Sequence, residues 1–213
     1  MINEVIERFR SQLYEISDLN DLSAQKTVLM SEHLNKLLNF QSRMTSKNVK
    51  LDYSKSSVHA NAIENILAVS AKEKFDLSYI LEKIIIKNDT WYKIDLVHLL
   101  LDSISKKYGW DAVEHMGEFV PEKCIYPDDI DTFYHSILNL NHIYYLNHKS
   151  NVYIGEYLPE SIIKNEIQLF CHTPHYPTSF NHGIVKGLAK KYNNHLKLSI
   201  TNIEQGGHFK IVI

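Results

Sequence analysis

The stretch 167–213 constrains the fold most, because strand, helix and turn patterns follow one another there without a gap. Its opening letters, IQLFCH, alternate across a predicted strand, with Ile167, Leu169 and Cys171 on one face and Phe170 and His172 on the other. Pro174 and Pro177 end that strand, since proline has no N–H for the ladder. NHGIVKGLAKKY then has helical spacing, and alternating runs flank a Gly-Gly pair that suits a tight turn. This order predicts an α+β fold, with helices packed on a small antiparallel sheet.

Helical periodicity dominates the rest of the chain. Apolar residues recur with helical spacing in the segments 2–16, 23–43, 60–70, 77–86, 97–108 and 128–146. The polar stretch 45–57 is predicted as a loop that contains a short strand at 49–53. Residues 1–90 carry no chemical motif. We interpret them as an N-terminal helical region for packing or dimerisation, and we expect the ligand-binding domain in residues 91–213.

Composition excludes several classes of protein. The formal net charge is −2, which gives no basic field for nucleic acid. No apolar run approaches the roughly 20 residues of a membrane span. The opening MINEVIERFRSQL is unlike a signal peptide, and Cys124 and Cys171 form no disulfide framework, so we expect a cytoplasmic protein. Because G-x-S-x-G, P-loop and H-E-x-x-H motifs are absent, we predict no catalytic residues and no enzyme.

The segment 128–146 is predicted as one long helix with apolar side chains on more than one side. Such a helix is buried or lines a pocket. Rings with a few polar tips suit a mostly apolar ligand site. The predicted pocket residues are Tyr134, His135, Leu138, His142, Tyr145 and Phe170. The alternative is that the tyrosines simply fill the core.

Cysteine and histidine side chains, which can bind metal ions, are concentrated near the predicted sheet. Cys171, His172, His175 and His182 occur close together, and Glu204 and His208 flank the Gly-Gly turn. Sulfur and imidazole suit zinc, which prefers four such ligands in a tetrahedron. The predicted metal set is Cys171, His172, His175 and His208. The alternative is a histidine-bearing surface loop, because the spacing is irregular.

Four segments taken in order resemble a known superfamily. They are LVHLLLDSISKKYGWDAV at 96–113, Tyr126-Pro127 before a helix, YPTSFNHGIVKGLAKKY at 176–192 after Cys171, and GGHFKIVI at 206–213. Together they are similar to the group that joins heme-nitric oxide/oxygen binding (H-NOX) domains, 4-vinyl reductase-type sensors and TRAPP-type trafficking subunits. The resemblance covers about residues 91–213. It implies an α+β domain with a buried cavity, a homodimer, and heme, aromatic effectors or lipid chains as ligands.

The resemblance also implies where a heme would be held. His142 is the helical histidine in the position of an iron ligand, and the family's Tyr-x-Ser-x-Arg motif falls on Phe170, His172 and Pro174. The guanidinium that pairs with heme carboxylates is therefore missing. We predict a non-catalytic sensor or regulatory module for a small apolar or aromatic molecule, which signals to a separate protein. The alternatives are a heme-based NO/O2 sensor that uses His142, and an interaction scaffold of the trafficking type.

Overall fold

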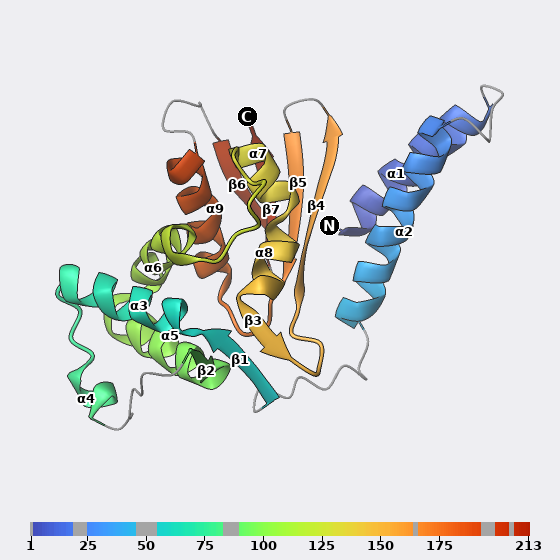
Figure 1. Ribbon diagram of the computed structural model, residues 1–213. Helices are drawn as coiled ribbons and strands as arrows, with labels where there is room; N and C mark the ends of the chain where they lie inside the picture. The colour runs from blue at the N-terminus through green and yellow to red at the C-terminus, as the bar shows by residue number, and fades with distance from the viewer. Residues whose placement is uncertain are drawn as a thin grey trace. The chain divides into compact units, whose positions relative to one another are not determined.

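The computed structural model describes residues 2–18, 25–45, 55–82, 90–163, 166–192, 199–204 and 207–213. The chain divides into two compact units, Met1–Lys50 and Leu51–Ile213, which we call unit 1 and unit 2. Figure 1 shows a pair of helices in unit 1 and an α+β arrangement in unit 2. The predicted fold class is confirmed.

Unit 1 contains two helices, α1 (Ile2–Asp18) and α2 (Gln25–Thr45). The apolar stripe of α1 is buried, as is the matching stripe of α2, and the two helices pack together. The buried residues of the two stripes are Val5, Ile6 and Phe9 of α1 and Leu37 and Phe40 of α2. Both helices confirm the periodicity of 2–16 and 23–43, because an amphipathic stripe is stable only when another stripe covers it.

Unit 2 holds the remaining elements. In chain order they are β1 (Ser56–His59), α3 (Ala60–Lys72), α4 (Ser78–Leu81), β2 (Trp91–Lys93), α5 (Ile94–Tyr108), α6 (Trp110–Lys123), α7 (Phe133–Leu138), α8 (Leu140–Leu146), β3 (His148–Ser150), β4 (Glu156–Ile163), β5 (Glu166–His172), α9 (Thr178–Tyr192), β6 (Ser199–Glu204) and β7 (His208–Val212).

Two antiparallel sheets organise unit 2. The larger has the strand order β4-β5-β7-β6, and the smaller has the order β2-β1-β3. In the larger sheet Ile167 pairs with Ile211, and Leu169 pairs with Phe209. The predicted alternation in β5 is confirmed, because one of its faces joins the apolar core formed with α7, α8 and α9. Figure 1 shows α7 and α8 running along that sheet.

A second apolar cluster lies among β1, α3, α5 and α6. It joins the first through α9, which packs closely against α6. Gly117 of α6 faces Gly183 of α9, and a Cβ on Gly183 would lie 1.9 Å from the carbonyl oxygen of Glu114. Glycine at this crossing therefore lets the two helix backbones approach closely.

The structure differs from the sequence prediction at several elements. The helix expected over 128–146 is two short helices, α7 and α8, with Asn139 between them. The helix expected over 77–86 is shorter, since α4 is described only over Ser78–Leu81 and residues 83–89 lie outside the described residues. The strand expected at 49–53 also lies outside them. Strand β4 has no counterpart in the prediction.

The division between units also differs from the predicted boundary after residue 90. It falls after Lys50, so β1 and α3 belong to unit 2. Val58 and Ile63 share the second apolar cluster with Val97. Residues 55–82 are therefore part of the same core as α5 and α6.

Candidate ligand-binding site

A cavity in unit 2 lies where the two apolar clusters meet. The space between its walls is about 710 Å³, including the part that opens to solvent. The lining residues are Val58, His59, Asn61, Ala62 and Asn65 of β1 and α3; Val97 of α5; Val120, Pro121, Lys123, Cys124 and Tyr126 at and after the end of α6; Leu140, Ile143, Tyr144, Asn147 and His148 of α8 and the residues directly after it; and Tyr157, Tyr176, Phe180, Ile184 and Leu188. The walls are mostly apolar, which is typical of sites for small molecules.

His148 lines the cavity, and both nitrogens of its imidazole ring make hydrogen bonds. Its Nδ1 lies 2.6 Å from the carbonyl oxygen of Tyr144, and its Nε2 lies 2.7 Å from the hydroxyl of Tyr176. A carbonyl oxygen only accepts, so Nδ1 carries the proton and Nε2 keeps its lone pair for the Tyr176 O–H. Burial lowers the pKa of His148 from 6.5 to about 4, which keeps the ring neutral.

Tyrosine hydroxyls fix the walls on the sheet side. Tyr144 donates to the carbonyl of Ile154 at 2.8 Å, and Tyr157 donates to Oδ1 of Asn181 at 2.6 Å. Asn181 in turn donates to Oγ1 of Thr173 at 2.8 Å. Burial raises the pKa of Tyr144 and of Tyr157 well above 10, so both stay neutral. This chain of hydrogen bonds joins β4, α9 and the segment after β5 around one wall.

Asn147 holds the segment after α6 against α8. Its Oδ1 accepts from the backbone N–H of Ile125 at 2.9 Å, and its Nδ2 donates to the Ile125 carbonyl at 2.9 Å. This pairing imitates a strand contact and fixes Cys124 and Tyr126 at the cavity. Burial raises the pKa of Cys124 to about 12, so its thiol is protonated at neutral pH.

Two lysines lie near the end of α6. Lys123 lines the cavity. Lys191 places its Nζ 3.7 Å from the ring centroid of Tyr126 and donates to the carbonyl of Pro121 at 2.8 Å. Partial burial lowers the pKa of Lys191. Of the two, Lys123 belongs to the lining, whereas Lys191 contacts Pro121 and Tyr126, which line the cavity.

Asn65 is a polar residue of α3 that lines the cavity with a side-chain donor for which the described residues offer no partner. The residue is 4% exposed and lines the cavity. Its Nδ2 makes no hydrogen bond among the residues that the structure describes. Buried side-chain donors nearly always have a partner. Sequence patterns gave no signal for this residue, because asparagine on a helix is ordinarily exposed.

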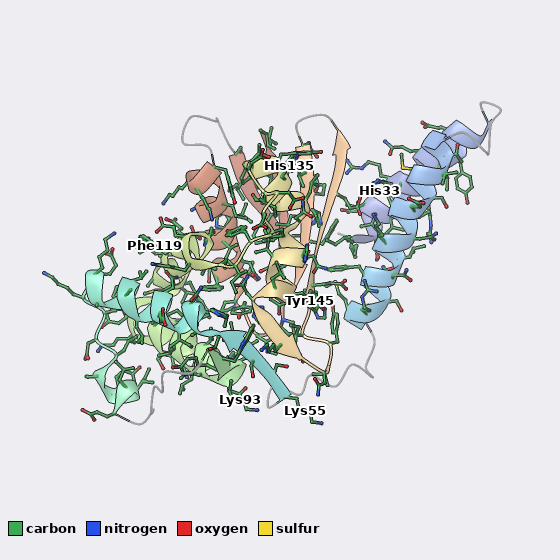
Figure 2. The ribbon with its side chains drawn as sticks, in the orientation of Figure 1. His33, Lys55, Lys93, Phe119, His135 and Tyr145 are labelled. Atoms are coloured by element: carbon green, nitrogen blue, oxygen red, sulfur yellow. The ribbon has the colours of Figure 1, made fainter. Side chains whose placement is uncertain are left out.

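The predicted pocket residues lie elsewhere. Tyr134, His135, Leu138, His142 and Tyr145 are all exposed, and none of them lines the cavity. Figure 2 labels His135 on α7 and Tyr145 on α8. The other stripe of the same segment faces the core and contributes Leu140 and Tyr144 to the walls. The sequence contained that signal, since this inner stripe is the more regular of the two.

Phe170 is also displaced from its predicted place. It lies on the face of β5 opposite Leu169 and Cys171, and its ring stacks on His208 at 4.1 Å. Leu169 and Cys171 are the residues that join the core cluster of α7 and α8. Phe170 therefore points away from the cavity.

The predicted metal ligands do not converge. Nδ1 of His172 lies 3.0 Å from the Tyr153 hydroxyl, and Nε2 of His208 lies 2.8 Å from Oε1 of Gln168. Burial raises the pKa of Cys171 well above 9, and burial lowers that of His175 to about 4. Within the part of the chain that the structure describes, no three His, Cys, Asp or Glu residues could hold a metal ion. The zinc prediction is therefore without support.

A heme can be tested against these residues. The apolar character of the walls suits its ring, and His148 is a neutral imidazole whose Nδ1 proton is fixed by a carbonyl, as in metal-binding histidines. Its Nε2, however, accepts from the Tyr176 hydroxyl, which would have to turn away before the nitrogen could bind iron. The heme carboxylates would have no guanidinium partner in unit 2, because the chain's three arginines all lie in unit 1. They are Arg8, Arg10 and Arg43. The residues suit the apolar ring in character, and Lys123 is the charged side chain of the lining that could face the carboxylates.

No protein-family model and no curated protein matches the sequence. Solved structures do match. An H-NOX protein from S. oneidensis in the Fe(II)NO ligation state has a TM-score of 0.52 at 14% identity, and the match covers 71% of this chain and 96% of that one. An unliganded Fe(II) H-NOX variant from K. algicida has a TM-score of 0.52 at 13% identity, with 72% and 95% covered. An H-NOX domain from Shewanella oneidensis in the Fe(II)CO state has a TM-score of 0.52 at 15% identity, with 71% and 95% covered.

The chain therefore has the H-NOX fold, and this part of the resemblance is confirmed. The match covers more of the chain than residues 91–213 can supply, so the likeness begins earlier than predicted. At such low identity it shows the fold alone. The 4-vinyl reductase and trafficking branches of the resemblance remain predictions. None of the helices that the structure describes is long and apolar enough to cross a membrane.

Proposed function

We propose that this chain is a non-catalytic sensor module that binds a small ligand in the cavity of unit 2. The observation that supports it best is the place of the cavity between two apolar clusters, so that a ligand would contact α3, α8, β4 and α9 together. Binding there can change how the clusters pack. Both thiols have raised pKa values and are poor nucleophiles at neutral pH, which favours binding over covalent catalysis.

Heme is the first candidate ligand, which would make the module a gas sensor. The fold likeness favours it, because the matching structures are H-NOX proteins in Fe(II), NO and CO states. A bound heme would supply an iron that takes a diatomic gas. We place the iron ligand at His148, because its ring lies at the cavity wall whereas His142 is exposed. Its Nε2 would then exchange the hydrogen bond from the Tyr176 hydroxyl for the iron. Lys123 and Lys191 would hold the carboxylates.

A small neutral organic molecule is the second candidate. The absence of arginine from unit 2 favours it, because heme carboxylates are best held by bidentate guanidinium groups. The rings of Tyr144, Tyr157 and Tyr176 offer apolar area with fixed hydroxyls. Such walls suit an aromatic or apolar molecule with few polar atoms.

Titration with hemin separates the two candidates. We expect a Soret band in the full chain if heme is the ligand, with His148→Ala shifting or abolishing it and His142→Ala leaving it intact. His135→Ala is the matched control, because that histidine is exposed on α7. Loss of the band in His142→Ala alone would return the iron ligand to His142. Without any band, native mass spectrometry of the purified protein would test for a bound organic molecule, and an empty cavity would favour the scaffold interpretation.

We propose further that unit 1 carries the homodimer contact and passes the signal to a separate protein. Its helices expose large apolar side chains, including Tyr14, Val28 and Met44. Exposed apolar residues on an otherwise packed helix pair are typical of association surfaces. Light scattering of the full chain tests the dimer, and a monomer at micromolar concentration would contradict it.

A further inference from the structure

We propose that Asn65 is the specificity residue of the cavity, and that it donates a hydrogen bond to a neutral acceptor oxygen on a small, mostly apolar ligand. This inference rests on the proposed sensor function and concerns the second of its two ligand candidates. A ketone or aldehyde oxygen on an aromatic ring has the required chemistry.

The polar groups around Asn65 on α3 are satisfied. The Nδ1 of His59 caps the helix by accepting from the N–H of Asn61 at 3.3 Å, and the side chain of Asn61 donates to the Lys123 carbonyl at 2.6 Å. Asn65 follows Asn61 by one turn and belongs to the same cavity-lining side of α3. Its Nδ2 differs from these neighbours, since it has no partner within the described residues.

A buried amide without a partner is costly, and native proteins rarely keep one unless a ligand or water completes it. Asn65 is 4% exposed, so bulk water does not satisfy its donor. The other nearby wall residues of α3 and α5, Ala62 and Val97, offer no acceptor from their side chains. The missing partner is therefore best supplied by a molecule held in the cavity.

The occupant's acceptor should be uncharged. His148 is a neutral ring with both nitrogens engaged, and Tyr144 and Tyr157 have already committed their hydroxyl protons to protein acceptors. A buried carboxylate would require a charged partner at Asn65, and an amide is not one. Lys123 is the charged residue of the cavity lining, and it is exposed. A neutral ketone oxygen meets the Asn65 donor without that cost.

A pair of isosteric probes tests the inference on the full chain, freed of any bound heme. Acetophenone carries a carbonyl oxygen, and α-methylstyrene replaces that oxygen with CH2 while keeping the shape. We expect acetophenone to bind about tenfold more tightly by calorimetry, and benzoate to bind more weakly than acetophenone.

Variants then assign the preference to one residue. Asn65→Leu should abolish the tenfold preference and raise the melting temperature of the ligand-free protein, because the unpaired donor is gone. Glu64→Leu is the matched control, since that side chain is exposed on α3 and lies outside the cavity lining, and it should keep the preference. If Asn65→Leu does not fold, Asn65→Ala replaces it, with the same loss of preference expected.

The outcomes separate the role of Asn65 from the sensor function on which it rests. Equal binding of acetophenone and α-methylstyrene to the unmodified chain would overturn the role of Asn65, for instance because a trapped water pairs with it, while leaving the sensor cavity intact. A preference that survives Asn65→Leu would overturn it as well. Failure of both probes to bind would count against the proposed ligand cavity itself, and tight benzoate binding would move the contact to Lys123.

Discussion

At the residue scale, the protonation state of His148 matters most for the cavity wall, because both of its ring nitrogens are hydrogen-bonded there. Its ring lies between a carbonyl that only accepts and a phenol that donates, so the neutral form satisfies both contacts. Protonation at Nε2 would place a donor against the Tyr176 O–H and a charge in an apolar wall. His148 is therefore a site where pH acts on the folded state directly.

Stability is expected to fall as pH decreases from 6.5 towards about 4, because the folded-state pKa of His148 is lowered over that interval. In this window the unfolded chain binds the proton and the folded chain does not, so acid favours unfolding by up to about 1.4 kcal/mol per pH unit. His175 has the same lowered pKa and adds to the slope. Urea unfolding between neutral pH and pH 5 measures it. His148→Gln should reduce the slope, and exposed His135→Gln should leave it unchanged.

Tyr157→Phe tests the buried hydrogen-bond chain of the sheet wall. The substitution keeps the ring but removes the hydroxyl that donates to Asn181, which leaves a buried amide oxygen without its partner. We expect a loss of about 1–3 kcal/mol of unfolding free energy. Tyr134→Phe, at a tyrosine with a 42% exposed side chain, should cost almost nothing in the same denaturant measurement. Equal small effects would mean that water replaces the lost hydroxyl.

Residue roles could be predicted from the sequence only where the phase of a helix was known. His142 and His148 have similar local contexts, and periodicity placed His142 on an apolar stripe. In the structure Leu140 and Tyr144 are the inward positions of α8, and they continue the stripe of Phe133 and Ile137 across the break at Asn139. His148 follows the helix, in β3, and no periodic pattern marks it. The two stripes therefore kept their phases through the break, and the sequence did not reveal which of them faces the core.

At the element scale, the strands differ in how well the sequence predicts them. Strands β5 and β7 alternate regularly, because one face of each packs under helices, and both were predicted. Strand β4 contains Pro159 and Glu160, which interrupt the pattern. It tolerates the proline because it is an edge strand of its sheet. Edge position is a property of the assembled sheet, so the sequence of β4 alone did not predict a strand.

The crossing of α6 and α9 should depend on its glycines. Gly183→Ala would place a Cβ 1.9 Å from the Glu114 carbonyl oxygen, a backbone atom that cannot turn aside. We expect a loss of about 3 kcal/mol or more, at the upper end of overpacking effects. Gly109→Ala is the control, since nothing lies within 4 Å of its added Cβ and only its φ of +85° is unfavourable, at about 1–2 kcal/mol. Thermal melts of both variants compare them. A smaller loss for Gly183→Ala than for Gly109→Ala would mean that α6 and α9 separate easily.

Ion pairs strengthen the same crossing from its surface. Glu114 of α6 accepts from His182 and Lys186 of α9, and Glu118 accepts from Lys190. The ion pairs and hydrogen bonds lower the pKa of Glu114 against the opposing effect of burial. These contacts are exposed in part, so they add little beside the glycine contact. The crossing is therefore held chiefly by the fit of its backbones.

At the scale of the whole molecule, the two units divide the proposed work. Every residue that lines the cavity lies between Val58 and Leu188, within unit 2. The helices of unit 1 pack their apolar stripes on each other. Their amphipathic pattern was visible in the sequence. The division of the chain after Lys50 was not, because it depends on contacts of β1 and α3 with α5 and α6 that the local sequence does not reveal.

The fragment 51–213 is expected to fold by itself and to bind its ligand as the full chain does. Its apolar clusters are complete, and all the cavity residues are present, so removal of residues 1–50 deletes no wall. We expect equal affinity for hemin or acetophenone in the fragment and the full chain, together with loss of dimerisation in light scattering. A fragment that stays dimeric would move the subunit contact to unit 2. A fragment that binds normally but no longer engages the signalling partner would place the output in α1 and α2, because binding and output would then have been separated by a cut that leaves the cavity untouched.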